Sequence, residues 1–323
     1  MRQRRSKWAL AVAAPGLVLG AAATYGLLRD PSPAPAPPVH TAPNVLPVAD
    51  GLSPPLRAPS FKMAPLNAAE MAAIAARAPA AGAPQFGSYA DHRDYVMTRG
   101  SNLFAFYFTR GVYSGGRGYG RRRGGGSWAT DYPKADIQFL WGLKRLTNID
   151  AYDYENAVLL TDPDLRRYPF LYMLEVGYMQ LTPPEVEGLR DYLAAGGFLF
   201  IDDFWGTYEW ENFVWEIHKV LPGSEIVDLP LDHPLFTTFY DIDEILQIPN
   251  VGNARAGYTS ERDGYVPYVR AISDDRGRLL VLINWNTDLG DAWEWAEDPY
   301  YPLTYSNYAY QMAVNAIVYA MSH

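Results

Sequence analysis

The sequence of 323 residues contains no cysteine. This absence excludes disulfide bonds, thiolate metal ligands and a cysteine nucleophile. Histidine is also scarce, with five residues, and none of them falls in a pattern with the ligand spacing of a zinc site. Acidic residues outnumber basic ones by 36 to 27, and the net charge of −9 argues against general nucleic-acid binding.

The N-terminus has the layout of an export segment. Basic residues between positions 2 and 7 precede an uncharged apolar run over residues 8–28, which is close to the roughly 20 residues that cross a bilayer as a helix. Residues 1–29 therefore predict either a cleaved signal peptide or a signal anchor that keeps the protein in the inner membrane. In both cases the positive-inside rule predicts a periplasmic or other extracytoplasmic location for the rest of the chain.

A spacer rich in proline and alanine follows at residues 30–84. This composition predicts a disordered but semi-rigid linker that holds the remainder of the chain away from the membrane. One short helix is expected at residues 67–76, because Asn67 is a good helix cap and helix-forming residues follow it. Residues 85–323 are then predicted to form a single α/β domain.

From about Tyr89 onward, apolar runs alternate with amphipathic stretches, which is typical of an α/β fold with a largely parallel sheet. The clearest unit is a capping box over residues 182–185, a helix ended by Gly196 and Gly197, and an apolar strand. Strands are predicted at 103–109, 157–160, 170–174 and 198–201, a hairpin at 269–283, and helices at 132–146, 182–195, 208–220 and 307–321.

Several separated motifs occur in an order that resembles a bacterial family of unknown function with exported or membrane-associated members. They are the segments 128–133, 164–172, 181–185, 196–203 and 232–236. That family is similar to the class I glutamine amidotransferase-like, trehalose-utilisation-type superfamily. Over roughly residues 100–321 the resemblance implies a three-layer, flavodoxin-like fold with a largely parallel sheet, and an assembly role at the cell envelope.

In the amidotransferases a cysteine lies on a strained turn after the strand that here ends at Ile201. This chain has Asp202-Asp203-Phe204-Trp205-Gly206 in that region, without a serine to replace the cysteine. A cysteine-dependent amidotransferase reaction is therefore excluded.

The strongest candidates for catalytic residues are acids. Asp202 and Asp203 follow a buried strand, where ligands bind in open parallel sheets. Such a pair can hold a divalent cation or supply a general base, or it can simply cap the next helix. His233, in a turn before a proline, is a candidate base, with a structural histidine bonded to the backbone as the alternative.

Candidate ligand-binding residues follow a second strand. Asn284, Asp288 and Asp291 form a polar set, although these residue types are also ordinary turn formers. Aromatic residues lie beside the acids of both segments, where flat rings suit stacking on sugars or contacts with a partner protein, and where the alternative is packing in the core. They include Trp205, Tyr208 and Trp293.

Arg110 opens a predicted loop, residues 110–126, that is rich in glycine and arginine. The loop lacks the P-loop pattern, because Gly126 stands where a lysine is required. It is interpreted either as a solvated loop or as a basic finger for an anionic partner.

Two functions are compatible with these residues. The first is a non-catalytic binding or assembly module for an envelope glycan or a partner protein. The alternative is a hydrolase that uses Asp202 and Asp203, with His233 in support and with or without a divalent metal. A divalent cation is the one cofactor considered, and the membrane is contacted through the N-terminal segment if that segment is not cleaved.

Overall fold

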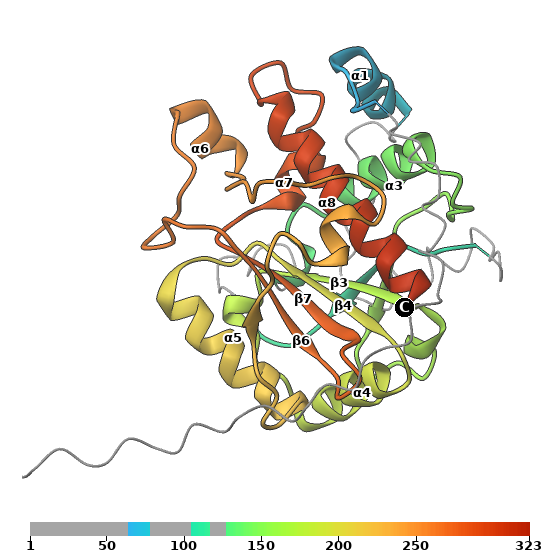
Figure 1. Cartoon of the computed structure of the whole chain (residues 1–323), viewed down its shortest axis with the longest axis vertical. Coiled ribbons are helices and arrows are strands. Elements are labelled where there is room, and N and C mark those ends of the chain that lie inside the picture. The colour runs from blue at the N-terminus through green and yellow to red at the C-terminus, as the bar shows by residue number, and fades with distance from the viewer. Residues whose placement is uncertain (1–63, 78–104, 117–126) are drawn as a thin grey trace, which may run out of the picture. The chain divides into compact units, whose positions relative to one another are not determined.

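The computed structural model describes residues 64–77, 105–116 and 127–323 (Figure 1). The predicted export segment and most of the predicted linker lie outside these residues. Among the helices of the described part, none is long and apolar enough to cross a membrane.

The described residues form a seven-stranded, mostly parallel sheet with the strand order β2-β1-β3-β4-β7-β6-β5. Neighbours from β2 to β7 run parallel, and β6 and β5 add an antiparallel edge. The strands are β1 Thr109–Val112, β2 Asn156–Leu159, β3 Phe170–Leu174, β4 Phe198–Asp202, β5 Val227–Asp228, β6 Tyr268–Ser273 and β7 Leu279–Trp285.

Helices cover both faces of this sheet because its strands are apolar on both sides. Helices α3, α7 and α8 cover one face, and α4 and α5 cover the other (Figure 1). In β3, Phe170 and Tyr172 belong to the apolar cluster on the first face, whereas Leu171 and Met173 belong to the cluster on the second. This alternation follows from the two-residue repeat of a strand. The helices are α1 Ala68–Arg77, α3 Lys134–Leu146, α4 Pro183–Ala194, α5 Gly206–Val220, α6 Val251–Ala256, α7 Leu289–Glu294 and α8 Leu303–Ser322.

The elements with strong local signals are confirmed. Strand β3 has the predicted bounds, and α4 begins with the predicted capping box, in which Thr182 and Glu185 satisfy each other's backbone N–H groups. The hairpin of β6 and β7 turns where expected, with Gly277 in the left-handed region. Helix α1 begins after Asn67, whose side chain accepts a hydrogen bond from the Glu70 N–H group at 3.0 Å.

Helix α1 belongs to the packed core. Met71 and Ile74 are buried in the same apolar cluster as Leu143 of α3, and Arg145 forms an ion pair with Glu70. The core therefore takes in residues 66–74, which lie within the range that the composition predicts to be linker.

The predicted first strand is wrong in its position. The sequence predicted residues 103–109, but β1 begins at Thr109 and ends at Val112. Its second residue, Arg110, is fully buried. A charged residue is tolerated in this central strand because Asp136 of α3 neutralises it inside the protein. Arg110 is thus part of the sheet and cannot serve in a solvated loop or a basic finger.

Candidate functional site

The backbone turns sharply after three neighbouring strands. Glu175 follows β3 with φ 52°, Asp203 follows β4 with φ 46°, and Asn286 follows β7 with φ 61°. Asp131, before α3, has φ 60°. Left-handed backbone is unfavourable for residues with a side chain and is often found at functional sites. These turns gather polar side chains at the carboxyl edge of the sheet.

Five carboxylates meet at this edge and are called here the carboxylate cluster: Asp131, Asp203, Asp288, Asp291 and Glu294. They form two overlapping groups. In the first triad, Asp131, Asp203 and Asp288 each offer an oxygen within 4.8 Å of the other two. In the second triad, Asp131 meets Asp291 and Glu294 within the same distance. Asp131 is therefore shared by both triads.

Burial and mutual repulsion favour protonated carboxyl groups in the cluster. The pKa values of Asp131, Asp203 and Asp288 are raised well above that of a free aspartate, first by burial and then by the neighbouring carboxylates. Burial likewise raises the pKa of Glu294 to about 7. Without a cation, protons must neutralise part of this charge.

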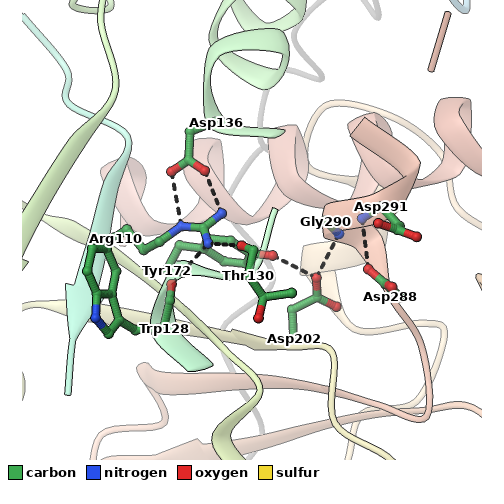
Figure 2. A network of polar contacts seen from close by, with 9 residues as sticks. All are labelled: Arg110, Trp128, Thr130, Asp136, Tyr172, Asp202, Asp288, Gly290 and Asp291. Atoms are coloured by element: carbon green, nitrogen blue, oxygen red, sulfur yellow. Dashed lines mark hydrogen bonds and ion pairs between the residues drawn. The ribbon is translucent and has the colours of Figure 1, made fainter. Parts of the chain in front are cut away.

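Asp202 lies beside the cluster but has a structural role. Its Oδ2 accepts hydrogen bonds from the Gly290 N–H group at 3.0 Å and from the Tyr172 hydroxyl at 2.9 Å (Figure 2). Its Oδ1 accepts a hydrogen bond from the Leu289 N–H group at 3.2 Å. Asp202 thus caps the N-terminal end of α7, and both of its oxygens are occupied. Burial raises its pKa to about 7.

Arg110 holds the segment that carries Asp131. Its guanidinium group pairs with both oxygens of Asp136 and donates hydrogen bonds to the backbone carbonyls of Trp128 and Thr130 (Figure 2). The carbon of the guanidinium group lies 5.1 Å from the ring centre of Tyr172. Its charge is therefore already paired, and the contacts to the two carbonyls fix the backbone next to Asp131.

One buried cluster oxygen lacks a hydrogen-bond donor in the described part of the chain. Oδ2 of Asp131 is buried and has no hydrogen-bond partner among the described residues. Asp203 accepts one hydrogen bond, from the Trp205 indole to its Oδ1 at 2.9 Å. Asp288 accepts one, from the Asp291 N–H group to its Oδ1 at 2.8 Å. Within the described part of the chain, Oδ2 of Asp131 is the one cluster oxygen that is both buried and without a hydrogen-bond partner.

Gly290 packs closely against oxygens of the cluster. A Cβ atom at this position would lie 2.8 Å from Oδ2 of Asp131, 3.0 Å from the Tyr172 hydroxyl and 3.5 Å from Oδ1 of Asp288. A methyl group would therefore collide with the oxygens. The set of carboxylates, together with the Asp131 oxygen that lacks a donor among the described residues, fits a hard divalent cation.

The predicted aromatic ligand contacts are wrong for two of the three residues. Trp205 and Trp293 are 1% and 0% exposed, so neither presents a ring face to a sugar. Trp293 packs edge-on against Phe108 in the core. Tyr208, in contrast, is 68% exposed and lies in the first turn of α5, near the ring of Tyr178.

Two other candidates have structural contacts. Asn284 is buried and donates a hydrogen bond to the Ile201 carbonyl at 2.9 Å, which ties β7 to β4. His233 accepts a hydrogen bond from the Leu235 N–H group at 3.2 Å and packs near Tyr319, which also contacts Phe198 at the amino end of β4. His233 therefore lies at the opposite edge of the sheet and cannot act as the base of this site.

Asp131 and Glu294 are site residues that the sequence did not predict. In the sequence, Asp131 stands near the start of a predicted helix, and Glu294 stands within an aromatic segment. The available signal was the acidic residue within the motif at 128–133, but nothing in the sequence places it beside residues 288–294.

The fold and the cluster together define an α/β protein with an acidic site at the carboxyl edge of its sheet. A family model described as "Domain of unknown function (DUF4159)" matches residues 118–321. This match covers more than half of the chain, and the chain belongs to that family. The matched range contains the whole carboxylate cluster. A search of curated proteins finds no match for this chain.

Proposed function

We propose that this chain is a divalent-cation-binding module of the cell envelope with a flavodoxin-like fold. The fold assignment rests on strand order: the parallel strands run 2-1-3-4-7, and with β7 counted as the fifth parallel strand this is the flavodoxin-like order 2-1-3-4-5. In such sheets ligands bind beyond the carboxyl ends of the strands, where the cluster lies. The location at the envelope rests on the export-like N-terminus.

The observation that carries the proposal is the pair of carboxylate triads that share Asp131. Several ionised carboxylates at this separation repel one another, and burial makes the repulsion stronger. A divalent cation offsets this charge and supplies a partner for the Asp131 oxygen that lacks a donor in the described chain. Mg²⁺, Mn²⁺ and Ca²⁺ prefer such oxygen ligands.

The bound cation would coordinate a ligand or a group of a partner protein, and Tyr208, in the first turn of α5, offers an exposed ring for a glycan or a protein partner. A hydrolase is the second candidate. It is favoured by Glu294, whose pKa of about 7 suits a general acid or base near neutral pH, and by the ability of a bound divalent cation to activate water.

The test is a thermal unfolding experiment on the full-length chain in detergent, with chelator and then with Mg²⁺, Mn²⁺ or Ca²⁺. A cation that binds only the folded state raises the unfolding midpoint. The informative variant is Asp131→Asn. It removes a buried charge, so the chelated protein keeps or gains stability while the response to the cation disappears.

The matched control is Asp191→Asn, which removes an exposed carboxylate on α4 that pairs with Arg166. This variant should respond to cations like the unmodified chain. The proposal fails if none of the three cations shifts the midpoint, or if Asp131→Asn responds as strongly as the control.

A further inference from the structure

We infer that the carboxylate cluster holds two divalent cations, with the Asp131 carboxylate as the bridge between them. The inference deepens the proposed function and rests on it. Each triad supplies one cation: Asp203 and Asp288 complete the first site, and Asp291 and Glu294 complete the second.

Geometry supports two sites better than one. The two triads share Asp131 alone. A carboxylate has two oxygens and can give one to each cation, and protein sites with two metals hold them about 3.5–4 Å apart. Within each triad the ligand oxygens lie within 4.8 Å of one another, which is the spread expected for oxygens around one cation with bonds of about 2.0–2.6 Å.

Charge points the same way. The five ionised carboxylates of the cluster leave an excess of three negative charges around one divalent cation, and an excess of one around two. The nearby basic side chains are already engaged, because Arg110 pairs with Asp136 and Lys134 pairs with Glu297. A buried excess of three charges is costly, so two cations match five ionised carboxylates better than one.

The Asp131 oxygen without a donor is an independent sign of a ligand. Oδ2 of Asp131 is buried without a hydrogen-bond partner in the described chain, and it lies so close to Gly290 that a Cβ atom there would come within 2.8 Å of it. Asp203 and Asp288 are more than nine-tenths buried, and each accepts one hydrogen bond from the described residues through its Oδ1.

The position of Asp131 is fixed before any cation arrives. Its carbonyl accepts a hydrogen bond from the Ala135 N–H group at 3.0 Å, at the start of α3. On the preceding side, Arg110 binds the Thr130 carbonyl. The backbone that carries the bridging carboxylate is thus held from both sides, as expected for a preorganised ligand.

The experiment uses Mn²⁺ with the full-length chain after chelation. Calorimetric titration should give two Mn²⁺ per chain, and the electron paramagnetic resonance spectrum should show spin coupling between them. Glu294→Gln should reduce the stoichiometry to one Mn²⁺ and restore an uncoupled spectrum, whereas Asp191→Asn should keep both ions and the coupling.

Outcomes separate the two proposals. One Mn²⁺ per unmodified chain, or two without spin coupling, overturns the bridged pair and leaves the cation-binding function intact. No Mn²⁺ bound overturns both. Far-ultraviolet circular dichroism checks that Glu294→Gln is folded, and the stoichiometry of the unmodified chain decides the question if that variant does not fold.

Discussion

The two edges of the sheet handle charge and backbone strain in opposite ways. At the amino edge, Arg278 pairs with Asp274 and donates to the carbonyls of Leu193 and Gly196, and the left-handed positions are the glycines Gly196 and Gly277. At the carboxyl edge, aspartates occupy left-handed positions and carboxylates face one another.

This difference between the two edges shows that the carboxyl edge contributes less to the stability of the folded state. Charge pairing and glycine at turns lower the free energy of the folded state, whereas strained turns and repelling acids raise it. Such conflicts are expected at functional sites. The contrast therefore favours a functional site at the carboxyl edge. The following experiments test this contrast, from the largest expected effect to the smallest.

The first prediction concerns the buried ion pair beneath the cluster. Asp136→Ala leaves Arg110 buried without its carboxylate, which should lower the free energy of unfolding by about 3–5 kcal/mol. At the amino edge, Asp274→Ala removes the carboxylate that pairs with Arg278. Because Arg278 already reaches solvent, the loss in the free energy of unfolding should be much smaller. Urea unfolding compares the two, and equal losses would contradict the contrast.

The second prediction concerns pH. In chelator, the free energy of unfolding should fall by up to about 3 kcal/mol as the pH rises from about 4 to about 7, and then level off. The sign follows because the pKa of Asp202 is raised to about 7 by burial, so the folded state binds more protons than the unfolded state in this window.

Denaturant unfolding at several pH values measures this slope. Asp202→Asn should make it shallower, because it removes one of the titrating groups. A slope unchanged in this variant would show that Asp202 is not ionising in this range.

The third prediction compares two glycines. Gly290→Ala places a methyl group among the cluster oxygens, and we expect it to abolish the cation response. Gly196→Ala meets no atom within 4 Å but has φ 104°, so it should cost about 1 kcal/mol of stability and leave the cation response intact. Thermal unfolding with and without Mn²⁺ separates the loss of the cation response from the loss of stability. A Gly290→Ala protein whose midpoint still rises with Mn²⁺ would contradict a cation site at this position.

The smallest effect is expected at His233. Burial lowers its pKa, so the unfolded state binds the proton more tightly and stability is lost as the pH falls below about 6.5. His233→Asn should remove that loss, which is small because the side chain is partly exposed, and denaturant unfolding at about pH 7.5 and 5.5 measures it. Its cation response should match the unmodified chain, and a reduced response would mean that the two edges are coupled.

The sequence alone determined the elements with short-range signals. The capping box of Thr182 and Glu185, the cap at Asn67 and the hairpin before Leu279 were predictable because each involves residues a few positions apart. The absence of cysteine likewise excludes thiol chemistry whatever fold the chain adopts.

Only the tertiary structure decided which acids meet. Asp131 joins Asp203 and Glu294 because parallel strands end at one edge of the sheet, and no local pattern encodes that distance. The burial of Arg110 and Trp293 was hidden for the same reason: both side chains look suited to solvent or ligand until a facing helix or strand supplies their partners. Local propensity acts within a few residues, whereas charge, burial and coordination depend on segments brought together by the whole fold.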